Sequence, residues 1–267
     1  HAWFNPYRAR HFQAKSGFAP THIAKTHPAS VKTYGDYHWM DPGDAFASQR
    51  TIQVVSDVVR RYAVDGVHID DYFYPYPIVD PKAPKPKPGE PAATIDFPDD
   101  PSWQVYQKSG GKLGRADWRR QNVDQLVERL HHAVHAVNPR VLFGVSPFGL
   151  GRPDRRPAGI EGFSQYDKLY ADVEKWLEQG WLDYLAPQLY WPRDRKGQEF
   201  PVLLDYWVKQ NTAKRHMWPG FFTSQLNDTP KSWATEEILK QLELVRGKAG
   251  ATGHIHYSMI ALMENRR

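Results

Sequence analysis

The sequence predicts one α/β domain of the (β/α)8 type, in which parallel strands alternate with helices. Short apolar runs alternate with amphipathic stretches of about 10 to 20 residues, a rhythm typical of β–α units around a parallel sheet. At 267 residues the chain can bury a large core, and α/β barrels of this length commonly form one domain. Six strands are expected, at residues 1–6, 65–70, 141–146, 181–189, 217–222 and 252–257.

Two of the intervening helices have clear sequence signals. Asp41 and Pro42 predict an N-cap followed by proline at the first helical position, and apolar residues then recur every three or four positions as far as Tyr62. A second helix is expected over 116–137, where an apolar stripe stops before Asn138. Both helices should cover the sheet.

Residues 75–115 interrupt this rhythm with seven prolines between Pro75 and Pro91, followed by an acidic turn and several glycines. A long stretch without secondary structure is uncommon inside a compact domain, and it is usually functional when it follows a strand with polar residues. We therefore expect a Pro-rich active-site loop within a single domain over 1–267. A disordered surface insertion is the alternative.

Composition narrows the classes of partner. Aromatic residues make up 13% of the chain, which suits a site that stacks flat ligands such as sugars, although a barrel core also uses them. The net charge is +5, but the basic residues are scattered, so we expect a solvated surface and no nucleic-acid partner. No apolar run approaches the roughly 18 residues of a membrane span, so no stable membrane insertion is expected. The absence of cysteine excludes disulfides and thiolate metal sites.

The most informative segment is 64–75, in which two adjacent carboxylates, Asp70 and Asp71, end an apolar strand. Buried carboxylates are costly unless paired or hydrogen-bonded, and at this end of a parallel barrel they usually serve catalysis or metal binding. Two nearby carboxylates raise the pKa of one of them, so that one holds a proton while the other stays ionised. Glycoside hydrolysis needs one protonated and one ionised carboxyl group, so Asp70 and Asp71 are the predicted catalytic residues. The alternative is a pair that caps the following turn.

Other strand ends carry hydrogen-bonding groups and flat rings, the mixture that a carbohydrate pocket uses. His68 shares a strand face with Asp70, since alternate side chains point the same way. The remaining candidates for substrate binding at these strand ends are Asn5, Tyr7, Arg8, Tyr72, Ser146, Gln188, Tyr190 and Trp191.

We expect no metal and no cofactor. His131 and His135 have the spacing of metal ligands on a helix, but no Glu lies between them as in zinc proteases, and a solvated helix end is favoured. His68 with Asp70 is the pair best placed to bind a metal in the barrel mouth. No glycine-rich phosphate loop is present, and the segment around Ser146 lacks the second glycine of a nucleophile elbow.

Several long motifs in order resemble the glycosyl-hydrolase-like 10 family: WFNPYR (3–8), VDGVHIDDYFYP (64–75), DWRRQNV (117–123), FGVSPFG (143–149), and LYAD with WLEQGWLDYLAPQLYW (169–191). The resemblance covers nearly the whole chain. It implies a TIM-barrel scaffold and a glycosidase of the bacterial cell envelope, since some members act on peptidoglycan glycan strands stripped of stem peptides.

The resemblance also aligns residues 1–6 with the third strand of the family barrel and 65–70 with the fourth. The chain would then hold strands three to eight and lack the first two β–α units. Six strands cannot close the usual barrel and leave an open edge. We therefore expect residues 1–267 alone to hydrolyse glycan strands weakly or not at all, and efficient hydrolysis would contradict this.

Likeness to hexosaminidase-type barrels suggests how the site would work. One of Asp70 and Asp71 would protonate the glycosidic oxygen, and the other would orient a substrate N-acetyl group or stabilise the oxocarbenium-like transition state. Trp39, Tyr190 and Trp191 would stack sugar rings, with Asn5, Arg8 and Gln188 binding hydroxyl or acetamido groups. The expected activity is hydrolysis of glycosidic bonds in a bacterial cell-wall or related polysaccharide containing N-acetylhexosamine.

Two other classes of function remain open on the sequence. A non-catalytic carbohydrate-binding protein would bind a glycan without releasing products. A metal-dependent polysaccharide deacetylase would use His68 and Asp70 as ligands and would lose activity on chelation.

Overall fold

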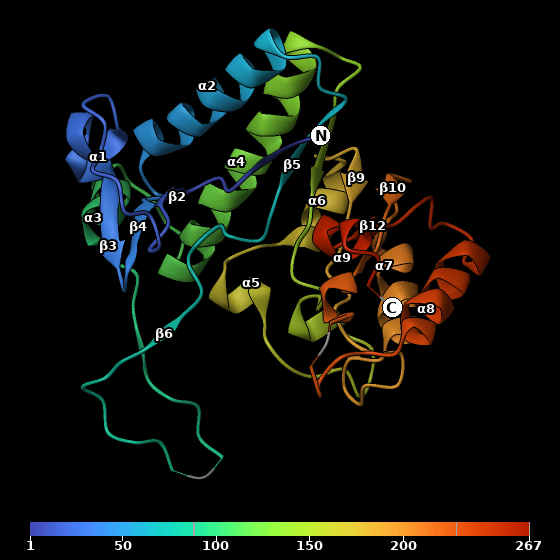
Figure 1. Cartoon of the computed structure of the whole chain (residues 1–267). Coiled ribbons are helices and arrows are strands. Elements are labelled where there is room, and N and C mark those ends of the chain that lie inside the picture. The colour runs from blue at the N-terminus through green and yellow to red at the C-terminus, as the bar shows by residue number, and fades with distance from the viewer. Residues whose placement is uncertain (88, 228, 267) are drawn as a thin grey trace.

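A computed structural model describes residues 1–87, 89–227 and 229–266, and its centre is a parallel sheet (Figure 1). The sheet contains, in order, β1 (Ala2–Phe4), β5 (Gly66–Ile69), β8 (Leu142–Val145), β9 (Tyr184–Leu185) and β10 (His216–Met217). Each strand pairs with the strand that precedes it in this series, as successive β–α units wound in one direction would produce. The protein is therefore an α/β protein with a parallel sheet.

The expected strand over 217–222 is divided at Trp218 and Pro219, because proline has no N–H to offer the ladder. Its second half, β11 (Gly220–Phe221), pairs in parallel with β12 (Ile255–His256). Gly220 N–H still donates to Pro187 O at 2.9 Å, so this pair continues from the main sheet. Among the described residues, β1 pairs only with β5 and β12 only with β11, and these strands do not form a closed ring.

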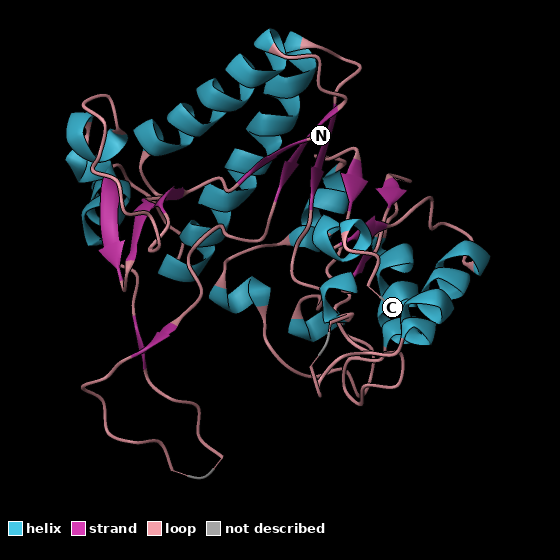
Figure 2. Cartoon of the chain, viewed as in Figure 1, coloured by secondary structure: helices cyan, strands magenta, loops and turns pink. Residues whose placement is uncertain are grey.

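Helices lie outside the strands (Figure 2). They are α2 (Ala45–Arg61), α4 (Arg115–Val137), α6 (Val173–Gln179), α7 (Phe200–Gln210) and α8 (Thr235–Gly247). α4 confirms the helix expected over 116–137, and Figure 1 shows α2 beside it. None of the helices in the described ranges combines the length and the apolar character needed to cross a bilayer.

α2 begins three residues later than the sequence predicts. Asp44 is the N-cap, with its carboxylate accepting from Phe46 N–H at 2.9 Å. The carboxylate of Asp41 instead accepts from Gly43 N–H at 2.9 Å and from the Ser102 hydroxyl at 2.6 Å. Asp41 therefore orders the turn before the helix and links it to the start of α3 (Asp100–Lys108).

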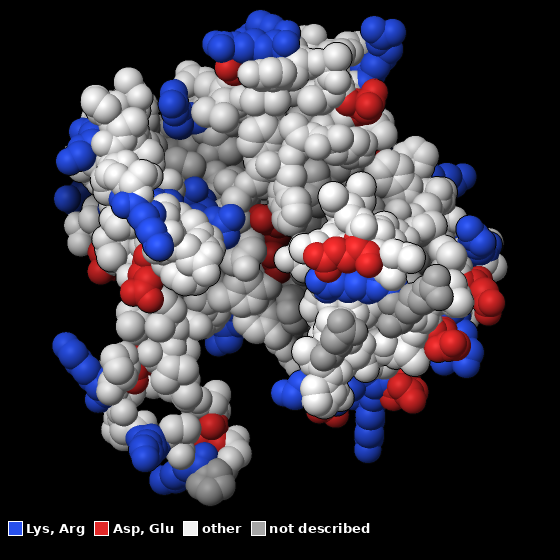
Figure 3. All heavy atoms as spheres, viewed as in Figure 1, with Lys and Arg blue, Asp and Glu red and all other residues white. Residues whose placement is uncertain are grey.

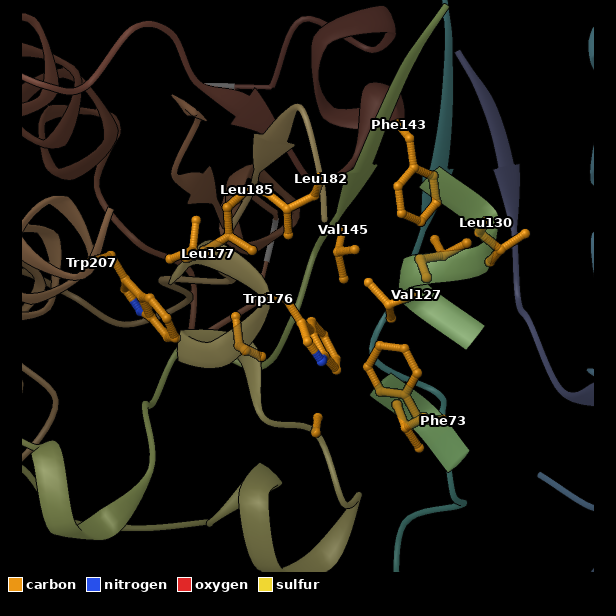
Figure 4. Packing of buried hydrophobic residues seen from close by; sticks show 14 of the residues in the cluster. Phe73, Val127, Leu130, Phe143, Val145, Trp176, Leu177, Leu182, Leu185 and Trp207 are labelled. Atoms are coloured by element: carbon orange, nitrogen blue, oxygen red, sulfur yellow. The ribbon is translucent and has the colours of Figure 1, made fainter. Parts of the chain in front are cut away.

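The core lies between the sheet and the outer helices (Figure 4). Val127 and Leu130 of α4 face β8, and Trp176 of α6 meets Phe73 edge-on with ring centroids 5.1 Å apart. The indole N–H of Trp176 donates to Asp124 of α4 at 2.6 Å, which gives its one polar atom a partner. This packing fixes the carboxyl ends of β5 and β8.

An antiparallel sheet that the sequence did not predict follows β1. It consists of β2 (Arg8–Arg10), β4 (Tyr37–Met40) and β3 (Val31–Tyr34), with α1 (Ile23–Thr26) and the 3-10 turn Pro28–Ser30 between them. Strands of three or four residues are too short for a readable alternation of apolar and polar positions. Trp39 of β4 donates to Phe73 O at 2.9 Å and so ties this sheet to the segment after β5.

Residues 75–115 are more ordered than expected. They contain the short hairpin of β6 (Ile78–Val79) and β7 (Thr94–Ile95) and the helix α3. Figure 1 shows the hairpin loop reaching away from the helices. Of the described prolines, Pro81, Pro84, Pro86 and Pro91 lie between the two strands of the hairpin, and α3 begins where proline is tolerated in a first helical turn. The remaining short elements are the 3-10 turns Pro153–Arg155 and Thr223–Gln225, α5 (Gln165–Lys168) and α9 (Met259–Met263).

Candidate active site

A cavity of about 960 Å³ opens at the carboxyl ends of β5, β8 and β9. This volume is at the upper end of that of small-molecule pockets. Seven of the predicted site residues line it: His68, Asp70, Asp71, Tyr72, Ser146, Gln188 and Tyr190. They come from successive strand ends, as the parallel arrangement requires.

Asp70 is held by N–H donors on both carboxylate oxygens. Asn5 Nδ2 lies 3.2 Å from Oδ1 and 3.1 Å from Oδ2, and Trp3 Nε1 lies 3.2 Å from Oδ2. Tyr72 N–H donates to Oδ1 at 3.3 Å. Burial, reinforced by the negative charge of Asp71, raises the pKa of Asp70 to about 6 in spite of these donors.

Asp71 is equally buried, with 4% of each residue exposed. The hydroxyl of Tyr76 donates to its Oδ2. Burial raises the pKa of the Asp71 carboxyl above its ordinary value, and the hydrogen bond from Tyr76 opposes that rise. The site therefore contains two neighbouring carboxyl groups with raised pKa. N–H groups hold Asp70, whereas the main hydrogen bond to Asp71 comes from the Tyr76 hydroxyl, with Gln188 also lowering its pKa.

His68 lies on the cavity side of β5 and is fixed at both ring nitrogens. Nδ1 lies 2.8 Å from the Tyr184 hydroxyl, and Nε2 lies 2.8 Å from Ser146 Oγ. Burial lowers the pKa of His68 to about 4, so the imidazole is neutral near pH 7. With both nitrogens engaged, His68 supports the floor of the cavity. Among the described residues, no group of three metal-ligating side chains forms in the cavity.

Aromatic rings line the same cavity as the carboxyl pair, and of these Tyr190 and Tyr72 were predicted from the sequence. Tyr190, Phe222 and Tyr257 form one cluster, with the Tyr190 ring centroid 5.0 Å from that of Phe222 and 5.5 Å from that of Tyr257 and its plane within 24° of both. The other rings lining the cavity that were not predicted are those of Trp3, Tyr76 and Trp218. Trp3 is 59% exposed although its indole N–H binds Asp70, so its ring face is available to a ligand. Its position two residues before Asn5, on the same strand face, is the signal that could have identified it.

Two predicted substrate-binding residues are in the core instead. Tyr7 is fully buried, and its hydroxyl lies 3.2 Å from Ser48 Oγ in α2. Trp39 is 1% exposed and donates to the Phe73 carbonyl. The prediction for these two was wrong, because Tyr7 is buried against α2 and Trp39, in β4 of the unforeseen antiparallel sheet, is buried against the segment after β5.

Three further candidates lie outside the cavity lining. Asn5 acts on the site through Asp70, and its Oδ1 accepts from Arg8 N–H at 3.1 Å. The Arg8 guanidinium lies over the Tyr72 ring, 5.3 Å from its centroid. Trp191 meets Phe148 edge-on at 5.6 Å and packs against the core. Of the long 75–115 segment, Tyr76 alone among the described residues lines the cavity, so its role as a cover for substrate stays a prediction.

Basic side chains are spread over the face shown in Figure 3, without a continuous patch. The cavity itself contains no Lys or Arg among its described lining residues. Its chemistry is carboxyl, hydroxyl, amide and aromatic.

The chain is similar to a known protein family and to named members of it. The model of the family described as glycosyl hydrolase-like 10 matches residues 1–235. The chain is 34% identical over 273 residues to glycosyl hydrolase YngK of Bacillus subtilis strain 168, a match covering 99% of this chain and 51% of that protein. It is 33% identical over 265 residues to glycosyl hydrolase DigH of Escherichia coli K12, covering 91% and 56%. The chain thus spans about half the length of these relatives.

Two solved structures share the fold. The glycoside hydrolase domain of PgaB (BpsB) from Bordetella bronchiseptica superposes with a TM-score of 0.56 at 14% identity, covering 87% of this chain and 63% of that one. The β-galactosidase of Rahnella sp. R3 gives a TM-score of 0.51 at 15% identity, covering 90% and 39%.

Proposed function

This chain belongs to the glycosyl hydrolase-like 10 family, and from that premise we propose that it hydrolyses glycosidic bonds in a polysaccharide containing N-acetylhexosamine, such as bacterial cell-wall glycan. The observation that carries the proposal is the pair Asp70 and Asp71, two buried carboxyl groups with raised pKa in an aromatic-lined cavity. A protonated and an ionised carboxyl group side by side supply what cleavage through an oxocarbenium-like transition state needs.

The hydrogen bonds favour different roles for the two groups. Asp70 faces only N–H donors, from Trp3, Asn5 and Tyr72, and such a shell suits an ionised carboxylate. Asp71 is bound by the Tyr76 hydroxyl, whose oxygen can accept a hydrogen bond from a protonated carboxyl group as well as donate one to a carboxylate. We therefore assign the transferable proton to Asp71.

In this scheme Asp71 gives its proton to the glycosidic oxygen as the bond to the anomeric carbon breaks. Asp70 stabilises the positive charge that develops on the sugar ring, or orients the acetamido group of the substrate. Water then adds to the anomeric carbon and returns a proton to Asp71. The ring faces of Tyr190 and Trp218 and the amide of Gln188 lie around the same cavity, where they would hold the sugar. Removal of water by these rings strengthens the electrostatic interaction between substrate and carboxylate.

Product analysis tests the proposed substrate class. Incubation with peptide-free peptidoglycan, chitin oligomers and plain glucans, followed by mass spectrometry, should give shorter glycans only from the N-acetylhexosamine-containing polymers. Shorter glycans from plain glucan alone would contradict the substrate class. Binding without any new product, in a longer chain that contains residues 1–267 as well as in these residues alone, would favour the non-catalytic alternative. Loss of acetyl groups at constant chain length would favour a deacetylase.

The pH dependence of hydrolysis follows from the same carboxyl groups. Burial and the negative charge of Asp71 raise the pKa of Asp70 to about 6, and because the two carboxyl groups titrate as a coupled pair, this value belongs to the pair and not to one residue. We expect kcat to fall above about pH 6, approaching a tenfold loss per pH unit. A pH–rate profile checks this, with circular dichroism at each pH as the control for folding. A rate that stays constant from pH 6 to 9 would contradict an essential proton on the pair.

A further inference from the structure

Three side chains that can bind a metal gather on the side of the sheet away from the cavity. His131 and His135 lie one turn apart on α4, and Asp183 immediately precedes β9. One ligand atom from each lies within 4.8 Å of the others. His135 Nε2 is 2.8 Å from Asp183 Oδ2, and His131 Nε2 is 3.6 Å from Asp183 Oδ1. The sequence-based expectation of a solvated helix end does not hold, because Asp183 faces both imidazoles.

The alternation of side chains along a strand explains why this cluster is separate from the cavity. Asp183 and Tyr184 are successive residues, so their side chains point to opposite faces of the sheet. The Tyr184 hydroxyl points inward and binds His68, whereas Asp183 points outward toward α4. None of the three clustered residues is among the described residues that line the cavity.

His131 is the member whose environment is incomplete. Both of its ring nitrogens are buried, and neither has a hydrogen-bond partner. Leaving a buried polar group without a partner costs about 1–3 kcal/mol. The 3.6 Å between His131 Nε2 and Asp183 Oδ1 is long for a hydrogen bond. It is close to the roughly 3.3 Å that separates two ligands of one tetrahedral zinc ion bound at about 2.0–2.1 Å.

Asp183 is available as an anionic ligand. Its Oδ2 accepts from the Phe143 N–H at 2.7 Å and lies 2.8 Å from His135 Nε2. The Phe143 N–H also fixes the orientation of the carboxylate, the support that metal ligands commonly receive from outside the metal's own shell.

We propose that His131, His135 and Asp183 bind one divalent ion of the zinc class and so connect α4 to the start of β9. Two imidazoles and one carboxylate are a donor set that zinc accepts, with water completing the tetrahedron. The ion would replace the hydrogen bond between His135 and Asp183 and give His131 the partner it lacks. Because the cluster is outside the cavity, the ion stabilises the fold and takes no part in the hydrolysis proposed for Asp70 and Asp71.

Calorimetric titration of metal-free protein with ZnCl2 tests this proposal. We expect one tight site, and a rise in Tm of about 5 °C when free zinc is a hundredfold above Kd. His131→Ala should weaken that site at least tenfold, which at the same free zinc reduces the rise in Tm by about half or more. His132→Ala is the matched control, since His132 is the exposed neighbour on the same helix, and it should change neither.

A second measurement does not depend on how the variants fold. Anomalous diffraction at the zinc edge from crystals of the wild-type protein should place the metal between α4 and β9. Equal zinc affinity in His131→Ala and His132→Ala, or zinc located only at other histidines, would overturn the proposal. So would the absence of a tight site, in which case the three residues form only a hydrogen-bonded link between α4 and β9.

Discussion

Asp71→Asn should lower kcat on a natural glycan by about 10²- to 10⁴-fold, because the leaving sugar then departs without a proton. The same variant should retain most activity on an aryl glycoside whose leaving group is a weak base and needs no protonation. Asp70→Asn should lose activity on both substrates. The negative charge of Asp70 stabilises the positive charge on the sugar ring whatever the leaving group is. Steady-state kinetics on the two substrates separate these effects.

The assay uses whichever form of the protein gives measurable turnover, residues 1–267 or a longer chain that contains them. Asp65→Asn is the matched control, because Asp65 is an exposed carboxylate just before the same strand and lies away from the cavity lining. It should leave both rates unchanged. Near-wild-type turnover in both Asp70→Asn and Asp71→Asn would remove the pair from catalysis, and the reverse pattern on the two substrates would exchange their roles.

Asp99→Ala should lower the free energy of unfolding by about 3–5 kcal/mol. The Asp99 side chain is fully buried and binds Arg119 through two parallel bonds, from Nε at 2.8 Å and from Nη2 at 2.7 Å. Arg115 also donates to it. Arg119 is itself 3% exposed, so removal of Asp99 leaves a buried guanidinium without its main counter-charge. Urea unfolding followed by circular dichroism measures the change.

The adjacent Asp100 provides the control for this experiment. It pairs with Arg115 at 2.6 Å, but its side chain is 70% exposed, so Asp100→Ala should cost less than about 1 kcal/mol. Equal destabilisation by the two variants would mean that the ion pair between Asp99 and Arg119 does not anchor the start of α3 to α4. A selective effect of Asp99→Ala would show that the segment after the hairpin depends on this buried pair.

Features carried by a single element could be predicted from the sequence. The stripe of Val123, Val127 and Leu130 gave the position of α4, and the apolar strand ending at Asp70 and Asp71 gave the candidate catalytic pair. The strand ends bearing Ser146 and Gln188 also line the cavity, as expected. These predictions needed only the periods of helix and strand and the rule that parallel strands bring their ends to one face.

The tertiary structure decided what depends on contacts between distant segments. It buried Tyr7 against α2 and Trp39 against the segment after β5, and it brought Trp3 to Asp70 across 67 positions of sequence. It also set Asp183 against His131 and His135, a third ligand that no local spacing could supply. A local pattern tells which side chains share a face of one element. Which faces meet depends on long-range packing, and so the sequence identified the carboxyl pair whereas only the fold identified the partners of its residues.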